Sequence, residues 1–229
     1  MIKIFAVNPF REVTYIVSDE KSKKCVIIDC GAQEQFEFDR ITDYIQQNEL
    51  QPTMLLNTHA HIDHILGISY MKSRYNIPFA VSSLDQPTLD IAKVSGRTYG
   101  LVDDNFVAPT IDIDLNCENN REIIFGDTII KVIPTPGHTS GGVSFLIEES
   151  GVLFTGDTLF QGSIGRTDLP TGDYDVLMES IIKTLIPLAK EREITLYPGH
   201  GNHTTIAQEL MNNPFIVEVL TNSVNPEIE

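Results

Sequence analysis

The chain contains 229 residues, of which 41% are hydrophobic and 21% charged, as is typical of a globular domain that buries its own core. Its formal net charge of −16 repels phosphate backbones and therefore disfavours a nucleic-acid partner. The apolar runs fall short of the roughly 18 residues that a membrane span needs, and the N-terminus lacks a signal-peptide pattern. We therefore expect a cytoplasmic protein with no membrane partner.

The cysteines agree with that expectation. Three are present, Cys25, Cys30 and Cys117, and their odd number and wide spacing argue against a disulfide framework. Cys25 and Cys30 belong to the apolar segment CVIIDCG, which favours buried free thiols. A chain without disulfides is the default for the cytoplasm.

The first part of the chain predicts strands separated by helices. Short β-branched runs bounded by turn residues predict strands at 1–7, 13–19, 24–31, 53–58 and 77–83. Apolar residues at helical spacing predict helices at 34–49, 63–76 and about 84–94. Asp63 stands where an N-cap of the second helix is expected.

Strands crowd together after residue 121. They are predicted in the segments EIIF, TIIKVIPT, GVSFLIEE and GVLFTGD, and again in ITLYPG at 194–199. Helices are predicted at 173–190 and 205–211, the latter with a Thr205–Gln208 capping box and an end marked by Pro214. This order favours a layered α/β protein with two sheets and helices outside them. No linker or repeat interrupts it, so we expect one domain over 1–229.

Four apolar strands end just before a residue of a type that binds metals. MLLNT precedes His59, IKVIPTPG precedes His138, GVLFTG precedes Asp157, and ITLYPG precedes His200. In layered α/β folds, sites gather where strands end, because a rigid sheet positions the short loops there. If the four strands are neighbours, their loops converge on one site.

The segment THAHIDH holds three of the six histidines between His59 and His64. Residues two apart in an extended chain can face the same way, so His59 and His61 could bind one metal. Asp63 and His64 could then bind a second metal. Imidazole and carboxylate ligands favour Zn²⁺, Fe or Mn²⁺, and no cysteine lies near to form a structural thiolate site.

These residues resemble the metallo-β-lactamase superfamily. THAHIDH is similar to its H-x-H-x-D-H signature, and TPGHTSGGVSF, LFTGDTLF and YPGHG are similar to its later motifs, over residues 13–203 in all. The resemblance implies an αββα four-layer sandwich with a binuclear site at one edge. It also implies two divalent metal ions, zinc first, with Fe or Mn as alternatives.

The resemblance assigns ligands to each metal. The first metal takes His59, His61 and His138. The second metal takes Asp63, His64 and His200. Asp157 bridges the two metals.

TGDTLFQGSIGRTDLPTGD, followed by LYPGHGNHTTIAQELMNNPF, is similar to the short, single-domain glyoxalase II-like (hydroxyacylglutathione hydrolase-like) proteins. Full-length glyoxalase II carries a C-terminal helical domain that helps to hold glutathione, but only 29 residues follow His200 in this 229-residue chain, so we expect no such domain. The family's loop also has a Lys and a Tyr that contact glutathione, where this chain has Arg166 and Asp168. Arg166 could bind a substrate carboxylate through its planar fork, or pair with Asp168 within the loop.

The expected function is metal-dependent hydrolysis of a small-molecule thioester by a hydroxide held between two metals, with Asp63 orienting the nucleophile. One alternative is a persulfide dioxygenase with a single iron on His59, His138 and Asp157, because that branch shares the H-x-H-x-D-H run. A lactonase or another esterase of the same fold is a third possibility. A metal-binding protein without catalysis is disfavoured because the whole ligand set is present.

Overall fold

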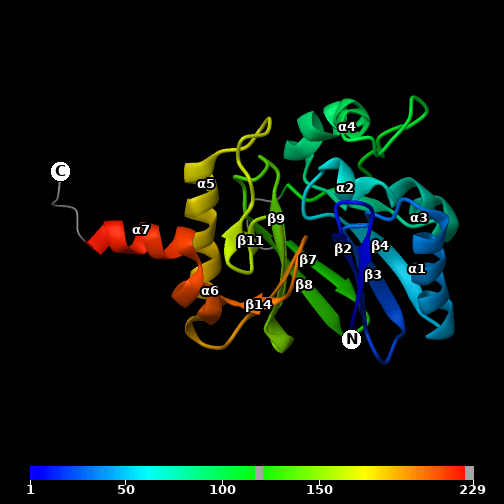
Figure 1. Cartoon of the computed structure of the whole chain (residues 1–229). Coiled ribbons are helices and arrows are strands. Elements are labelled where there is room, and N and C mark those ends of the chain that lie inside the picture. The colour runs from blue at the N-terminus through cyan, green and yellow to red at the C-terminus, as the bar shows by residue number, and fades with distance from the viewer. Residues whose placement is uncertain (117–120, 225–229) are drawn as a thin grey trace.

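Two six-stranded β-sheets stand at the centre of the protein, and helices cover their outer sides, as Figure 1 shows for the computed structural model. The structure describes residues 1–116 and 121–224, so Cys117 lies outside the described residues. Cys25 and Cys30 are buried free thiols, as the sequence predicts. The predicted α/β sandwich of four layers is confirmed.

The first sheet comes from the N-terminal half of the chain, with the order β1-β2-β3-β4-β5-β6. Its strands are β1 (Ile2–Val7), β2 (Glu12–Ser18), β3 (Lys24–Ile28), β4 (Gln51–Leu56), β5 (Phe79–Val81) and β6 (Ile113–Asp114). The first three strands pair antiparallel, and β3 to β6 pair in parallel. The carboxyl ends of β3 and β4 therefore lie at the same edge, where Asp29 and His59 follow them.

The second sheet has the order β14-β13-β10-β9-β8-β7. Its strands are β7 (Arg121–Phe125), β8 (Thr128–Pro134), β9 (Val143–Ile147), β10 (Val152–Gly156), β13 (Thr195–Pro198) and β14 (Thr204–Thr205). β9 is antiparallel to both β8 and β10, and β13 is parallel to β10. Strands β8, β10 and β13 thus run in one direction, and the loops carrying His138, Asp157 and His200 leave from one edge.

Helices and short elements complete the chain. The helices are α1 (Gln35–Gln47), α2 (Ile62–Ile65), α3 (Ile68–Tyr75), α4 (Gln86–Thr98), α5 (Tyr174–Glu179), α6 (Ile206–Asn212) and α7 (Pro214–Val224). A small hairpin is formed by β11 (Leu159–Phe160) and β12 (Ser163–Ile164). Single 3₁₀ turns occur at Ser83–Asp85 and Glu148–Ser150. None of the helices in 1–116 and 121–224 has the length and apolarity to cross a membrane.

Three hydrophobic cores hold the layers together. The central core packs the inward sides of the two sheets, and two outer cores pack the first sheet on α1 to α4 and the second on α5 to α7. Tyr15 joins the two sheets, because its ring lies edge-on to Phe154 at 5.0 Å and its hydroxyl donates to the Pro198 carbonyl at 2.5 Å. This buried hydroxyl is satisfied next to the His200 loop, so the core also fixes one wall of the site.

The predicted helix over 63–76 is wrong in one respect: the structure divides it into α2 and α3 at Gly67. The Gly67 amide donates to the Cys30 carbonyl at 2.9 Å, and a Cβ on Gly67 would stand 2.8 Å from the Cys30 sulfur. This close approach pulls the chain out of a continuous helix. His61, not Asp63, is the N-cap residue of α2, and the Asp63 carboxylate faces His200 instead.

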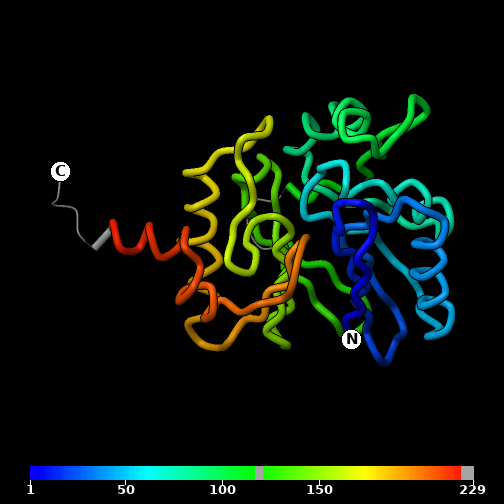
Figure 2. The backbone as a smooth tube through the Cα atoms, viewed as in Figure 1, coloured from blue at the N-terminus to red at the C-terminus, as the bar shows by residue number. Residues whose placement is uncertain are grey.

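The predicted helix over 173–190 also changes form along its length. It begins as α5 with the Asp173 side chain accepting from the Val176 amide, continues as a π-helix at Ser180–Leu185, and ends as a 3₁₀ turn at Ile186–Lys190. Pro187 has no N–H to donate, which accounts for the change of register before it. Pro214 does end α6, but it also begins α7, which projects from the body of the protein (Figure 2).

Candidate metal centre

Three imidazoles from two loops meet at the edge where the strands end. His59 and His61 follow β4, and His138 follows β8; their ring nitrogens form a group close enough to share one ion. His61 Nδ1 lies 2.9 Å from His138 Nε2, and the ring centroids of His59 and His138 are 4.8 Å apart. These residues are the set that the sequence resemblance assigns to the first metal.

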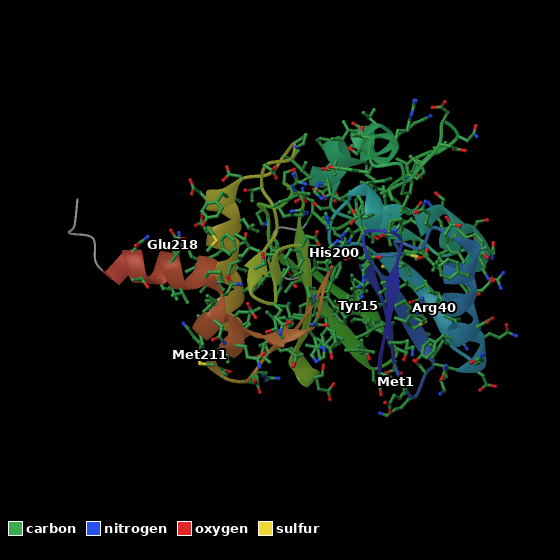
Figure 3. The ribbon with its side chains drawn as sticks, in the orientation of Figure 1. Met1, Tyr15, Arg40, His200, Met211 and Glu218 are labelled. Atoms are coloured by element: carbon green, nitrogen blue, oxygen red, sulfur yellow. The ribbon has the colours of Figure 1, made fainter. Side chains whose placement is uncertain are left out.

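A second group lies beside the first. It contains Asp63 and His64 from α2 and His200 from the loop after β13. Asp63 Oδ2 is 3.1 Å from His200 Nε2 and 3.7 Å from His64 Nε2. Figure 3 labels His200, which lies between the two halves of the sandwich. These three residues are the set expected for the second metal.

Asp157 lies between the two groups. Its Oδ1 is 3.4 Å from His64 Nε2, and its Oδ2 is 3.6 Å from both His138 Nε2 and His200 Nε2. Gly199 makes this approach possible, because a Cβ there would stand 2.2 Å from Asp157 Oδ1. One carboxylate therefore contacts histidines of both groups, as a bridging ligand must.

The donor atoms have the properties of metal ligands. Within the described residues, His59 Nε2, His64 Nε2 and Asp157 Oδ1 are buried without a hydrogen-bond partner, a costly arrangement unless an ion takes their lone pairs. Burial lowers the pKa of His61 to about 3, helped by His138, and lowers the pKa of His59 well below its usual range. Both rings are thus neutral, the form that binds metal.

Backbone carbonyls orient two of the rings. His138 Nδ1 lies 2.7 Å from the Arg166 carbonyl, and His200 Nδ1 lies 3.1 Å from the Phe10 carbonyl. A carbonyl only accepts, so each Nδ1 carries a proton and each Nε2 is the ring nitrogen that faces the centre. The loops that hold Arg166 and Phe10 therefore set the tautomers of the ligands.

Asp29 supports the centre from outside and is not part of the sequence motifs that indicate the ligands. Its Oδ2 lies 3.3 Å from His64 Nδ1, and its carboxylate accepts from the Thr58 amide and hydroxyl, both at 2.7 Å. The Thr58 hydroxyl lies 3.1 Å from His59 Nδ1. Asp29 thus positions one histidine of each group. An acidic residue directly after the apolar run CVII was the available signal.

We expect Asp29→Asn to weaken metal binding by about 10–100-fold, the usual effect of losing a partner behind a ligand. Asparagine fits the left-handed backbone at this position (φ 52°) but removes the charge that faces His64. Titration with a competing chelator measures the affinity, and Asp43→Asn, on the exposed side of α1, is the control. Equal affinities in the two variants would contradict a positioning role for Asp29.

Asp85 connects the two loops that carry the first group. Its carboxylate accepts from the Ala60 amide at 2.8 Å, from the Gly141 amide at 2.7 Å and from the Thr139 hydroxyl at 3.1 Å. Burial raises the pKa of this carboxyl in spite of those hydrogen bonds. Nothing in the local sequence distinguishes Asp85 from the other acidic residues, so only the structure assigns it this position.

A cavity of about 570 Å³ opens over both groups. Donor residues of both groups lie at one side of it, and apolar side chains from the loop after β1, from α2 and α4, and from the β11–β12 hairpin and the loop after it form its walls. The wall residues include Phe10, Ile62, Ile91, Ala92, Tyr99, Phe160, Ile164, Leu169 and Pro170. A cavity of this size accommodates a small organic molecule.

Arg166 lines the same cavity and is paired with Asp168. Its Nε and Nη2 atoms each lie 2.7 Å from one oxygen of that carboxylate, a bidentate ion pair on an exposed loop. The sequence allowed Arg166 either to bind a substrate carboxylate or to pair with Asp168, and the structure contains the pair. The backbone carbonyl of Arg166 orients His138.

Comparison with known proteins fits this arrangement. A sequence profile of the metallo-β-lactamase superfamily matches residues 7–200. The chain belongs to the metallo-β-lactamase superfamily. It is 35% identical over 220 residues to hydroxyacylglutathione hydrolase GloC of Haemophilus influenzae, covering 94% of this chain and 97% of that protein. It is 33% identical to the probable metallo-hydrolase YqgX of Bacillus subtilis, covering 92% and 94%.

Solved structures of the superfamily share the fold. The B3 metallo-β-lactamase BLEG-1 superposes with a TM-score of 0.83 at 33% identity, over 94% of this chain and 99% of that one. A di-iron-bound form of TTHA1623 superposes with a TM-score of 0.79 at 32% identity, over 93% and 99%. The superfamily binds divalent metals, and the His/Asp groups of this member are suited to hold them.

Proposed function

We propose that the protein is a binuclear metallo-hydrolase that cleaves small-molecule thioesters, in the manner of the glyoxalase II-like branch. The observation that carries this proposal is the position of Asp157 between two groups of three ligand residues, at one side of a cavity. The relative named as a hydroxyacylglutathione hydrolase, which matches almost the full length of this chain, supports the substrate class.

His59, His61 and His138 would hold one ion, Asp63, His64 and His200 would hold a second, and Asp157 lies where it could serve both. Nitrogen and oxygen donors without thiolates suit Zn²⁺, and iron is the other candidate because a similar protein is known in a di-iron form. Bound divalent metals supply Lewis-acid chemistry, since they lower the pKa of water from 15.7 to about 7 and polarise a carbonyl oxygen.

The chain's own residues position the reactants. Burial alone would raise the pKa of Asp63, but His64 and His200 outweigh it and lower the pKa, so Asp63 is a carboxylate that would accept a hydrogen bond from the attacking water and orient it. Water adds its oxygen to the acyl carbon, and the C–S bond breaks. The departing thiolate has a conjugate acid of pKa about 8.5, so it leaves without a general acid.

The test is hydrolysis by the purified protein loaded with Zn²⁺ or Fe²⁺, with S-D-lactoylglutathione and simple thioesters as substrates. We expect thiol release that rises with metal content up to two ions per chain, without consumption of O₂. One iron per chain with O₂ uptake on a persulfide, and no thiol release from thioesters, would contradict the proposal and favour the dioxygenase.

A further inference from the structure

Asn8 joins the turn between β1 and β2, residues 8–11, to the helix that carries Asp63. Its side-chain amide donates to the Asp63 carbonyl at 2.9 Å and to the Gly31 carbonyl at 3.0 Å, and its Oδ1 accepts from the Phe10 amide at 2.9 Å. The backbone of Asn8 is left-handed (φ 48°), a conformation that asparagine adopts more readily than most residues. The side chain is buried and both of its polar atoms are hydrogen-bonded, so it fixes the turn against α2.

The same turn orients His200. The Phe10 carbonyl accepts from His200 Nδ1 at 3.1 Å. Directly after the turn, Glu12 forms an antiparallel β-bridge with His200, and the Val13 amide donates to the Gly199 carbonyl at 2.8 Å. The position of the His200 ring therefore depends on main-chain contacts with the turn and with the start of β2.

The third ligand of the second group, His64, faces the side chain of Glu12. Glu12 is fully buried, and its Oε1 lies 3.9 Å from His64 Nδ1, next to Asp29 Oδ2 at 3.3 Å from the same nitrogen. Gly31 permits this arrangement, because a Cβ there would stand 2.3 Å from Glu12 Oε2 and 2.1 Å from the Asp63 carbonyl. Each ligand of the second group thus has a contact with the turn or with the residue that follows it.

The first ligand group is held by other parts of the chain. Asp85 accepts from the amides of Ala60 and Gly141, and the Arg166 carbonyl orients His138. Because the two groups have different supports, a change in the turn should affect the binding of one ion and spare the other.

We propose that Asn8 and the turn that it begins position the second ligand group and so determine whether the centre holds two ions or one. This role rests on the proposed binuclear hydrolase and names the part of the chain that controls its second ion. Asn8 is not among the residues that line the cavity, so it acts through Asp63 and, by way of the Phe10 carbonyl, through His200.

The test uses Asn8→Gly, because glycine accepts the left-handed backbone and keeps the amide that donates to Glu37 Oε1 at 2.6 Å. Competition with a chelator for Zn²⁺ gives one dissociation constant for each ion. We expect one constant to rise about 10–100-fold, the usual effect of losing a partner behind a ligand, and the other to change less than about threefold. Asn76→Gly is the matched control, since Asn76 is also left-handed (φ 52°) but exposed at the end of α3, and both of its constants should match the parent.

Anomalous diffraction identifies the ion that is lost. Crystals of Asn8→Gly, equilibrated with free Zn²⁺ buffered between its two constants, should contain one peak, among His59, His61 and His138. A peak retained in the second group instead, unchanged constants, or equal weakening of both constants would overturn the role of Asn8, since a general loss of stability does not distinguish two ions. A parent protein that binds fewer than two ions would contradict the proposed function as well.

Asn8→Asp provides the same test if Asn8→Gly does not fold. Aspartate keeps the shape of the side chain and the acceptor for the Phe10 amide, but it replaces the donor to Asp63 by a carboxylate oxygen. The same ion should be lost. Excess Zn²⁺ should restore kcat in both variants, because Asn8 positions ligands and takes no part in the chemistry; low turnover with two ions bound would overturn the positioning role.

Discussion

Asp157→Ala is expected to lower kcat for thioester hydrolysis by about 10³-fold or more, because the developing charge on the substrate loses several kcal/mol of stabilisation. The reason is geometric: the Asp157 carboxylate lies within 3.6 Å of His64, His138 and His200, members of both ligand groups. Removal of this carboxylate takes away the negative charge that lies between the three imidazoles. Metal content should fall below two ions per chain as well.

The control for this variant is Asp127→Ala, which removes an exposed carboxylate paired with Lys21 far from the centre and should change kcat by less than twofold. Circular dichroism of both variants establishes that each is folded. Turnover by Asp157→Ala within threefold of the parent, at equal metal loading, would contradict a bridging role for this residue.

Asp85→Ala is expected to destabilise the protein by about 3–5 kcal/mol, because several buried donors lose their acceptor at a cost of about 1–3 kcal/mol each. The substitution leaves the amides of Ala60 and Gly141 and the hydroxyl of Thr139 without an acceptor, since all three donate to this carboxylate in the interior. For a domain of this size the loss corresponds to a fall in Tm of roughly 10 °C. Since Ala60 and Thr139 adjoin candidate ligands, kcat should fall too.

Thermal unfolding of the metal-free protein isolates the structural part of this effect, because bound metal would add its own stabilisation. Asp90→Ala is the matched control, because Asp90 lies in α4 shortly after Asp85 but is exposed, with a single hydrogen bond from Gln86, and its loss should change stability by no more than about 0.5 kcal/mol. Asp85→Asn keeps an acceptor and should fall between the two. Equal Tm values for Asp85→Ala and Asp90→Ala would contradict the conclusion that Asp85 holds the two ligand loops together.

Much of the fold was predictable because the short-range sequence patterns of strands and turns agree with the sheets that the chain forms. The strands at β1 to β5 and β7 to β10 are short β-branched runs bounded by turn residues, and each was expected within a few residues of its observed bounds. The convergence of the loops carrying His59, His138, Asp157 and His200 followed from their place after strands. Only the structure shows the order of the strands, which places the ends of the strands that precede these residues at one edge.

The remainder depended on contacts between distant residues. The break at Gly67 arises from its approach to Cys30, and the roles of Asp29 and Asp85 arise from hydrogen bonds to residues 25 or more positions away. Periodicity and capping patterns describe near neighbours and contain no information on such contacts. The pairing of Arg166 with Asp168 is a local contact, and the sequence left it open because either partner could have faced the cavity instead.

The most direct measurement is anomalous diffraction from crystals of the metal-loaded protein, recorded at the absorption edge of the bound metal. We expect two peaks, one among His59, His61 and His138 and one among Asp63, His64 and His200, with the Asp157 carboxylate between them. A single peak at full metal loading, or peaks away from Asp157, would contradict the binuclear centre proposed here.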